Sequence, residues 1–336
     1  MRVLCFNAGS SALRVAGFEA RGGEVREAFA RRSLADEDWR AAIPQAFVPD
    51  VVAHRIVRGA KIGMAAEPYT QAVNAEIAAN ADLAPTHDPH ALALLAQSQT
   101  AFPSANQIVV YDSAFHASIG PAQFTYAIPL EWRERGIRRV GYHGLSCAYA
   151  AEWLERNAGH PARAVHAHLG NGCSVTALRN GKSVATTMGY TPLEGAVMGT
   201  RCGSIDPGIL LEMQRLGMAP DELRGALFRE SGLRALCGTN DMREIERRRA
   251  NGDPQAHLAF EVFLASACGA IAQMAAAAGG IDALTLAGGI GLHSQQVRNE
   301  ITARLGWMLR DTKIFTLDVQ EERMMALAAL PARTPA

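Results

Sequence analysis

The chain begins with the string Val3-Leu4-Cys5-Phe6-Asn7-Ala8-Gly9-Ser10-Ser11, in which a short apolar strand runs directly into a tight glycine turn. Residues 164–174 and 284–291 share this plan. Because glycine lets the backbone approach a phosphate closely and presents N–H groups to it, three such turns favour phosphate binding over three ordinary turns. None of them matches the P-loop or the dinucleotide-binding glycine pattern.

A second strand follows the turn in the first two segments, at residues 13–18 and 175–178. In the second segment, Asn180-Gly181 then gives the signal of a two-residue hairpin. Residues 1–20 and 164–188 therefore read as two copies of one β-hairpin plan, which predicts duplicated α/β domains.

Strands and helices are mixed along the rest of the chain, which is typical of an α/β fold. Further strands are expected at residues 51–57, 107–111 and 313–319, the last followed by a short helix. Helices are expected at residues 69–81, 89–99, 145–157, 207–217 and within 241–278. We predict a first domain at residues 1–146 and a second at 147–322, with the tail 323–336 returning to the first.

Composition excludes several classes of protein. The 336 residues carry 33 cationic and 33 acidic side chains, so no broad attraction to nucleic acid or to an acidic membrane surface is expected. Six scattered cysteines without a C-x-x-C pair predict neither a zinc site nor a disulfide framework, which fits a reducing, cytoplasmic compartment. The start of the chain lacks the features of a signal peptide. Residues 262–281 are uncharged but rich in Ala and Gly, which favours a buried helix ended by Gly279-Gly280 over a membrane span.

Three residues could cancel or bind phosphate charge. Phosphoryl transfer needs cations on the equatorial oxygens of the phosphate and a metal that bridges the phosphates. The candidates are Arg55 in His54-Arg55-Ile56-Val57, Arg201 in Met198-Gly199-Thr200-Arg201-Cys202-Gly203, and His143 in Gly141-Tyr142-His143-Gly144. The plainer interpretation is a surface or structural ion pair for each arginine and a structural role for the histidine.

Four carboxylates could take part in the chemistry: Asp112, Glu194, Asp206 and Glu322. Asp206 precedes Pro207 and reads as a helix N-cap. Asp112 could equally be a turn residue at a strand end, Glu194 a turn residue, and Glu322 part of a solvated helix face.

Taken together, the motifs resemble the acetate kinase family, within the acetate and propionate kinase group. The matching strings include those at residues 7–11, 54–57, 111–116, 136–144, 168–172, 180–207, 231–233, 241–243 and 289–291. They are collinear with the family pattern and cover the chain almost end to end.

The resemblance implies a duplicated actin-like, sugar-kinase-like fold with ATP in a central cleft. It implies Arg55 and Arg201 as ligands of the acid and of the transferring phosphoryl group, His143 as the transition-state donor, and Asp112 as a further catalytic residue. The implied acyl pocket consists of Val57, Thr86, Tyr142 and Pro192. The implied nucleotide site consists of Arg14, His168, Leu169, Gly170, Asn171, Gly172, Asp241, Met242, Arg243, Gly289, Ile290, Gly291, Leu292 and His293. Asn7 and Glu322 are implied to be linked to Mg²⁺ or Mn²⁺, with Glu321 as the alternative to Glu322. A homodimer is also implied.

Asp112 corresponds to a residue that the family often labels a proton acceptor. A short carboxylic acid has a pKa near that of a glutamate, about 4.3, so the nucleophile is already ionised at neutral pH. We therefore expect Asp112 to orient Mg²⁺-bound waters or Arg201.

The chain departs from the family pattern at several positions. Ala12 and Arg14 stand where the family usually has Ser and Lys, and Arg58 and Ala60 where it has His and Gly. Leu292-His293 replaces a usual Glu-Asn. Acetate is the first choice of substrate. Because Thr86 and Tyr142 each add a hydroxyl to the implied acyl pocket, propionate or a hydroxylated acid is the alternative.

The sequence thus predicts a kinase that transfers the terminal phosphoryl group of ATP to acetate and forms acetyl phosphate and ADP. A sugar-type kinase on the same fold would need a carboxylate base for a neutral hydroxyl, for which Asp112 is the candidate. A non-catalytic, actin-like nucleotide-binding protein is the alternative outside enzymes.

Overall fold

The computed structural model describes the chain except residues 10–11, 34–38, 60, 62, 86 and 332–336. It divides into two compact units. Unit 1 comprises residues 1–117, 142–149 and 320 onward, and unit 2 comprises residues 118–141 and 150–319. Packing thus assigns residues 118–141 to unit 2, whereas the sequence placed them in the first domain. Helix α5 (Gly144–Asn157) begins in unit 1 and continues in unit 2.

Unit 1 contains a six-stranded sheet in the order β3-β2-β1-β4-β6-β5. Strands β1, β4 and β6 are parallel neighbours, so their carboxyl ends lie at one edge of the sheet. The strands are β1 (Arg2–Ala8), β2 (Leu13–Arg21), β3 (Glu24–Ser33), β4 (Val51–Ile56), β5 (Ala66–Pro68) and β6 (Asn106–Tyr111). The helices are α1 (Gln71–Asn80), α2 (Asp88–Ala101) and α13 (Glu321–Ala328), with 3-10 turns at Trp39–Ala42, Ala81–Leu83 and Ala114–Ser118.

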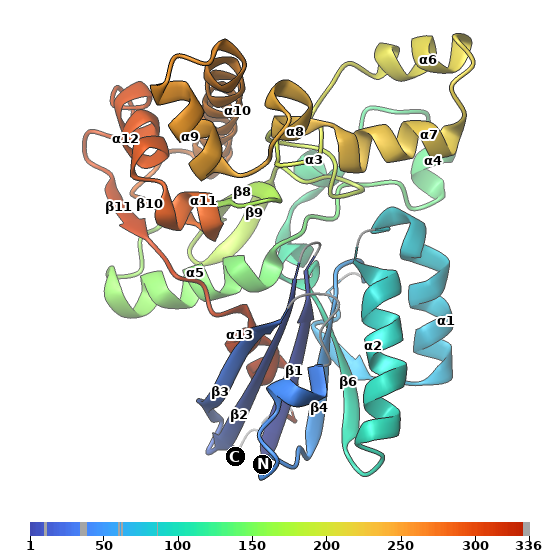
Figure 1. Ribbon diagram of the computed structural model, residues 1–336. Helices are drawn as coiled ribbons and strands as arrows, with labels where there is room; N and C mark the ends of the chain where they lie inside the picture. The colour runs from blue at the N-terminus through green and yellow to red at the C-terminus, as the bar shows by residue number, and fades with distance from the viewer. Residues whose placement is uncertain (10–11, 34–38, 60, 62, 86, 332–336) are drawn as a thin grey trace. The chain divides into compact units, whose positions relative to one another are not determined.

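The core of unit 1 follows from the alternation of side chains along β1. Leu4 and Phe6 point to the face covered by α1 and α2, whereas Val3 and Cys5 point to the face covered by α13. Figure 1 shows α1 and α2 side by side along the first of these faces. Both faces are therefore covered, and polar side chains gather at the carboxyl edge of the strands.

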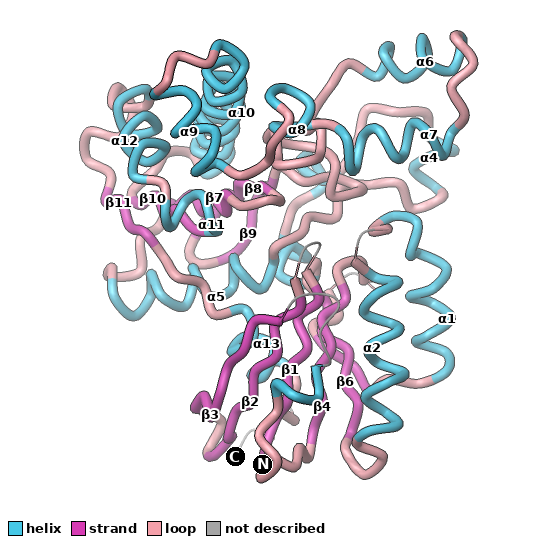
Figure 2. Tube along the Cα trace, viewed as in Figure 1, coloured by secondary structure: helices cyan, strands magenta, loops and turns pink. Residues whose placement is uncertain are grey.

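Unit 2 contains a five-stranded sheet in the order β11-β10-β7-β8-β9. Its strands are β7 (Arg163–Leu169), β8 (Cys173–Arg179), β9 (Lys182–Thr186), β10 (Ala283–Ala287) and β11 (Lys313–Thr316). Its helices are α3 (Pro121–Phe124), α4 (Leu130–Glu134), α6 (Pro207–Arg215), α7 (Pro220–Gly225), α8 (Gly232–Cys237), α9 (Met242–Ala250), α10 (Pro254–Ala278), α11 (Gly288–His293) and α12 (Gln295–Arg304), with a π-helical turn at Ala226–Glu230. In Figure 2 the helices of both units are cyan and the strands are magenta.

The two sheets share one plan, which confirms the predicted duplication. In each, three antiparallel strands (β3-β2-β1 and β9-β8-β7) are followed by two strands parallel to the innermost of them (β4-β6 and β10-β11). Unit 1 adds the short β5 at its edge. The predicted hairpin turn is also present, because Asn180 and Gly181 both adopt left-handed backbone conformations, with φ of 49° and 73°.

Most predicted helices are confirmed, and the helical region 241–278 is interrupted near its start. Asp253 caps α10 by accepting hydrogen bonds from the N–H groups of Gln255 and Ala256, and Pro254 takes the first helical position. Asp206 caps α6 in the same way, as expected. The six cysteines are free, as predicted.

Helix α10 is long and apolar enough to cross a membrane by length and composition, with a mean hydropathy of 1.6 over its most apolar window. It is instead a core helix of unit 2, since one side of it is buried against the sheet and the neighbouring helices. Gly279 ends the helix with φ of 79°, which confirms the predicted glycine stop.

Candidate active site

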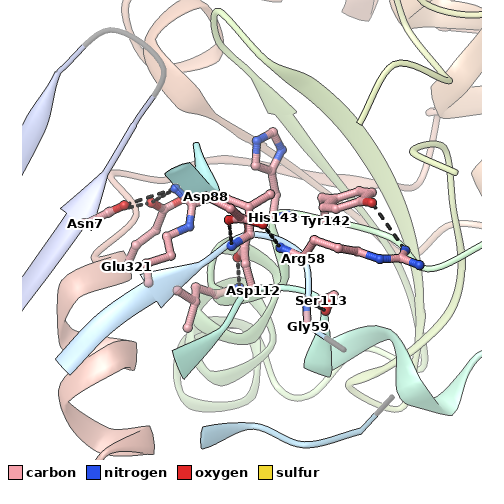
Figure 3. Close-up of polar contacts among 12 residues, drawn as sticks. Asn7, Arg58, Gly59, Asp88, Asp112, Ser113, Tyr142, His143 and Glu321 are labelled. Atoms are coloured by element: carbon pink, nitrogen blue, oxygen red, sulfur yellow. Dashed lines mark hydrogen bonds and ion pairs between the residues drawn. The ribbon is translucent and has the colours of Figure 1, made fainter. Parts of the chain in front are cut away.

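Five polar side chains gather at the carboxyl edge of the sheet in unit 1. We call them the strand-end cluster: Asn7 of β1, Arg55 of β4, Asp112 after β6, and Glu321 and Glu322 at the start of α13. Figure 3 shows Asn7 and Glu321 directed toward each other, and Asp112 next to the turn that carries His143. The parallel order of β1, β4 and β6 explains why residues so far apart in sequence meet here. This edge is where α/β sheets commonly bind ligands.

Arg55 is the central cation of the strand-end cluster. Its guanidinium donates from Nη2 to Oδ2 of Asp112 at 2.6 Å and from Nη1 to Oδ1 of Asn7 at 3.0 Å. Nη1 also lies 3.9 Å from Oε2 of Glu321. Burial disfavours the charge, but the attraction of Asp112 and Glu321 outweighs it and raises the pKa of Arg55 above its ordinary value. Arg55 is therefore a fixed, buried cation.

Asn7 connects the two glutamates of α13 to Arg55. Its Nδ2 donates to Oε2 of Glu321 at 2.9 Å and to Oε1 of Glu322 at 2.7 Å. Burial and the neighbouring charge of Glu321 raise the pKa of Glu322, whose side chain is only 13% exposed. The interpretation of Glu322 as part of a solvated helix face is therefore wrong. Both glutamates reach Asn7, so each stays a possible metal ligand.

The strand-end cluster has the donors that Mg²⁺ prefers. Three carboxylates, those of Asp112, Glu321 and Glu322, face two cations, Arg55 and Arg14, whose Nη1 lies 3.8 Å from Oε1 of Glu322. Oxygen ligands and excess negative charge suit this ion, which usually binds one or two carboxylates together with waters and phosphate. In the described part of the chain, no group of three or more His, Cys, Asp or Glu side chains forms an all-protein metal site.

Asp112 is fully buried, and its carboxylate accepts hydrogen bonds from the side chain of Arg55 and from two backbone N–H groups. Besides Arg55, its Oδ2 accepts the N–H of His143 and its Oδ1 accepts the N–H of Leu145, both at 3.0 Å. Its backbone carbonyl accepts the N–H of Gly144 at 2.9 Å. Asp112 therefore fixes Arg55, the turn of His143 and the start of α5. Its expected role toward Mg²⁺-bound waters or Arg201 stays a prediction.

The turn that carries His143 is strained. His143 has φ of 57°, in the left-handed region that few residues other than glycine adopt. A Cβ on Gly144 would lie 2.0 Å from the carbonyl oxygen of Asp112, so glycine is required there. Such strain costs of the order of 1–3 kcal/mol and concentrates at functional sites, which makes this turn a candidate part of the active site.

The loop after β4 is held by a residue that the sequence analysis missed. The carboxylate of Asp88, at the start of α2, accepts the N–H of Val57 at 2.8 Å and that of Arg58 at 3.2 Å. Burial raises the pKa of Asp88 to about 6. Nη1 of Arg58 donates to the hydroxyl of Tyr142 at 3.4 Å, so two departures from the family pattern contact each other. The signal in the sequence was an acidic residue at the start of a helix. Acidic residues are common at that position, so the signal did not distinguish Asp88 from an ordinary helix residue.

The predicted nucleotide residues of unit 2 come together around the glycine turn after β7. A Cβ on Gly288, which has φ of 75°, would lie 2.5 Å from the carbonyl oxygen of Leu169, so the turn after β10 packs directly on this turn. The side chain of Asn240 donates to that of Asn171 at 2.9 Å and brings the start of α9 to the same place. The turn after β7, the turn after β10 and the start of α9 therefore lie next to one another in unit 2.

The remaining nucleotide candidates lie at the two helices that follow. Asp241 caps α9 and binds the exposed Arg243, while Met242 is buried. In α11, Ile290 and Gly291 are buried, and His293 is exposed. Arg298 donates to the carbonyl oxygens of Gly291 and Leu292 at 3.1 and 2.7 Å. Thus the Leu292-His293 departure lies where Arg298 fixes the end of α11.

Arg201 is buried in the loop between β9 and α6. Its Nη1 donates to the carbonyl oxygen of Pro192 at 3.3 Å. Gly199 N–H donates to the carbonyl oxygen of Asn171 at 3.0 Å, which ties the Arg201 loop to the first glycine turn of unit 2. Burial raises the pKa of Cys173 to about 12, and the charge of Arg201 acts against this rise. The guanidinium therefore lies near the start of β8.

Glu194 has more partners than an ordinary turn residue. It binds the side chains of Tyr126 and Arg139, both from the segment 118–141 of the same unit. Among the other predicted site residues, Val57, Tyr142 and Pro192 are buried, whereas Thr86, Ala60, Ser10 and Ser11 lie outside the described residues.

With this geometry established, the chain can be compared with known proteins. The model of the acetokinase family matches residues 45–325. The chain belongs to the acetokinase family.

Individual relatives agree with the family assignment. The chain is 42% identical to the acetate kinase of Syntrophobacter fumaroxidans over 252 residues, which cover 74% of this chain and 61% of that protein. It is 43% identical to the acetate kinase of a Synechococcus strain over 271 residues, 79% of this chain and 67% of the relative. The matches thus span about three fifths to two thirds of the length of these relatives.

Solved structures of the same group confirm the predicted fold class. A propionate kinase from Francisella tularensis is 29% identical, with a TM-score of 0.85 and 98% coverage of both chains. The acetate kinase of Porphyromonas gingivalis is 26% identical, with a TM-score of 0.82 and the same coverage. The duplicated α/β plan of this acetokinase-family chain is therefore the plan of acetate and propionate kinases.

Proposed function

We propose that this chain is a kinase that transfers the terminal phosphoryl group of ATP to acetate and forms acetyl phosphate and ADP. The observation that carries the proposal is Arg55, a buried cation at the carboxyl ends of the parallel strands β1, β4 and β6, fixed by Asp112 and Asn7. A carboxylate substrate or a phosphoryl group is the natural partner of such a guanidinium. Membership of the acetokinase family supports the same reaction.

The proposed mechanism needs no general base. Acetate is ionised at neutral pH, so it can attack the phosphorus in line without losing a proton. Asp112 acts by position: it holds Arg55 and the backbone of His143. We assign Arg55 and Arg201 to binding the acid and the transferring phosphoryl group, and His143 to donating a hydrogen bond as charge develops on that group. ADP leaves with the bridging oxygen.

We assign a divalent cation, Mg²⁺ or Mn²⁺, to the strand-end cluster. Glu322 or Glu321 would hold it, with Asn7 fixing both carboxylates. Bound there, the cation would neutralise charge on the nucleotide phosphates. The nucleotide itself is assigned to the glycine turns at residues 168–172 and 289–293, the start of α9 at 241–243, and Arg14. The side chain of Arg14 is about one third exposed and is close to Glu322.

A hydroxylated short acid is the second candidate substrate. The hydroxyl of Tyr142 is buried and accepts a hydrogen bond from Arg58, which adds two polar groups beside Val57. A pocket built to hydrogen-bond a substrate hydroxyl discriminates more sharply than one that senses a methylene, whose contribution is about 1–3 kcal/mol. Propionate is the third choice. We further propose that the enzyme is a cytoplasmic homodimer that binds neither nucleic acid nor membrane, which agrees with its net charge of zero.

One assay tests the proposal. Purified protein is incubated with Mg²⁺-ATP, hydroxylamine and acetate, propionate, glycolate or lactate, and the acyl hydroxamate is measured. We expect the highest kcat/KM with acetate. A higher kcat/KM with propionate would reject acetate as the preferred acid, and no hydroxamate with any acid would reject the kinase.

A further inference from the structure

Glu194 of unit 2 holds together two segments that are far apart in sequence. Its Oε2 accepts a hydrogen bond from the hydroxyl of Tyr126, and its Oε1 accepts one from Nη2 of Arg139. The side chains of Arg139 and Glu194 are 17% and 35% exposed. Partial burial and two charge-assisted bonds make this contact firmer than an ion pair on the surface.

The partners of Glu194 are themselves bonded to the start of the same loop. Nη1 of Arg139 also donates to the carbonyl oxygen of Thr187 at 2.8 Å, and the hydroxyl oxygen of Tyr126 accepts the N–H of Tyr190 at 2.9 Å. Burial and the hydrogen bond to Glu194 raise the pKa of Tyr126, so its hydroxyl keeps its proton at neutral pH. These hydrogen bonds form one network, and Glu194 is its charged acceptor.

Gly189 shows that the loop is packed tightly on this carboxylate. A Cβ at Gly189 would lie 1.8 Å from Oε2 of Glu194 and 2.2 Å from the hydroxyl oxygen of Tyr126. Gly195, the residue after Glu194, has φ of 113°, and a Cβ there would lie 2.9 Å from the side chain of Thr187. The backbone at Gly189 therefore packs directly on the Glu194 carboxylate, and the backbone at Gly195 packs directly on Thr187.

The loop contacts the Arg201 segment on both sides of Glu194. Before it, the carbonyl oxygen of Pro192 accepts Nη1 of Arg201 at 3.3 Å. After it, the carbonyl oxygen of Gly195 accepts the N–H of Ser204 at 2.9 Å, and the N–H of Gly195 donates to the hydroxyl of Ser204 at 3.1 Å. Any movement of Glu194 is therefore passed to the residues that hold Arg201.

We infer that Glu194 is a positioning residue, which sets the place of Arg201 through Pro192 and Gly195. The kinetic consequence rests on the proposed function, in which Arg201 binds the transferring phosphoryl group. Positioning dominates phosphoryl transfer, and a displacement of about 1 Å can cost about 100-fold in rate. Tyr126 and Arg139, which precede the strained turn of His143 in the chain, hold the Glu194 carboxylate in place.

The first test does not depend on catalysis. Hydrogen exchange followed by mass spectrometry is compared for the wild type, Glu194→Ala, Glu194→Gln and the control Glu212→Gln, which removes an exposed ion pair with Arg215. We expect faster exchange at residues 189–204 in Glu194→Ala, a smaller change in Glu194→Gln, which still accepts from Tyr126, and none in the control. Unchanged exchange at 189–204 in Glu194→Ala would overturn the inference.

The second test separates positioning from general destabilisation. We expect Glu194→Ala to lower kcat about 100-fold and to change the KM for ATP less than about threefold. The kcat of Glu194→Gln should be about tenfold higher than that of Glu194→Ala. In an Arg201→Lys background the same Glu194→Ala change should cost less than about fivefold, because Arg201 is already lost. In an Arg55→Lys background it should still cost about 100-fold. Equal losses in both backgrounds would contradict action through Arg201.

The two proposals fail in different ways. A wild type that forms no acyl phosphate rejects the kinase and leaves the exchange experiment as the judge of Glu194. An active wild type whose Glu194→Ala variant keeps its kcat rejects the role of Glu194 alone. If Glu194→Ala does not fold, the Glu194→Gln variant, which keeps the side-chain shape, decides by the same readouts.

Discussion

Units 1 and 2 share a strand order but end their strands differently. In unit 1 the carboxyl ends carry buried charged side chains, with Arg55 between Asp112, Glu321 and Asn7. In unit 2 the corresponding ends carry glycine turns, in which Gly288 packs on Leu169. One topology thus supplies two chemically different strand ends, to which we assign the binding of phosphate or carboxylate.

The difference shows that the sheet determines where a site lies and that the turn residues determine its chemistry. A charged end binds through fixed guanidinium and carboxylate groups, which are costly to bury unless paired. A glycine end binds through backbone N–H groups, which need space and unusual φ values. Changes of charge should therefore damage unit 1, and the addition of a single methyl group should damage unit 2.

The largest expected effect is that of Arg55→Ala. This change removes the buried cation and leaves Asp112 and Glu321 without it, so kcat/KM for acetate should fall at least about 10³-fold, as for other arginines that bind a transferring phosphoryl group. Steady-state kinetics measure the effect. The exposed strand residue Arg26 provides the control, since Arg26→Ala removes a charge of the same sign from the same unit. A loss below tenfold would show that the strand-end cluster is structural.

Asp112→Asn should have the next largest effect. The amide keeps the shape of the side chain but holds Arg55 and the N–H groups of His143 and Leu145 less well, so kcat should fall about 100-fold. Because no base is needed, the acidic limb of the pH–rate profile should stay in place. A shift of that limb would restore Asp112 as a proton acceptor.

A methyl group at Gly288 tests the glycine end of unit 2. Gly288→Ala places a Cβ 2.5 Å from the carbonyl oxygen of Leu169 at a φ of 75°, which should lower the free energy of unfolding by about 3 kcal/mol. At the neighbouring Gly289 no atom lies within 4 Å of the position that a Cβ would take, so Gly289→Ala should leave stability nearly unchanged. Urea unfolding of both variants measures this. Equal stabilities would refute the close packing of the two turns.

Asp88→Asn tests whether a buried carboxylate of unit 1 makes the stability of the protein depend on pH. The folded-state pKa of Asp88 is raised to about 6 from 3.8, so the folded protein binds this proton more tightly than the unfolded chain does. Between about pH 4 and pH 6, rising pH therefore lowers the stability of the wild type by about 2 kcal/mol through this group. The asparagine variant should lack this loss.

The measurement for Asp88 is the difference in unfolding free energy between wild type and variant across that pH range. Asp221, whose side chain is 94% exposed, controls for the loss of one surface charge as Asp221→Asn. A difference that does not change with pH would show that Asp88 does not titrate in this range.

Sequence patterns predicted the repeated part of the fold well. Apolar runs ending in glycine, as at Phe6 and Leu169, gave the strands that form the two central layers, because a buried strand must be apolar and a tight turn needs glycine. The polar β3 escaped notice, since its side chains are largely exposed and it is recognised as a strand by its pairing with β2. Residues 118–141 were placed in the first domain because their neighbours in unit 2 are distant in sequence.

The site was predictable where motifs carry unusual residues and not where ordinary residues gain partners by folding. Arg55 and Asn7 could be named from their motifs. Asp88 and Glu194 look like a helix start and a turn in the sequence, and their importance follows from partners brought by the fold, the loop after β4 and the side chain of Arg139. The contact of Asp112 with Arg55 likewise forms only when β4 and β6 pair.

The central claim is that this chain transfers phosphoryl groups to a short acid through the charged end of unit 1. The most direct measurement uses the reverse reaction, in which purified protein, Mg²⁺, ADP and acetyl phosphate are mixed and ATP is measured by luminescence. We predict rapid ATP formation by the wild type and at least about 10³-fold slower formation by Arg55→Ala. No ATP from the wild type, or equal rates from the two proteins, would contradict the claim.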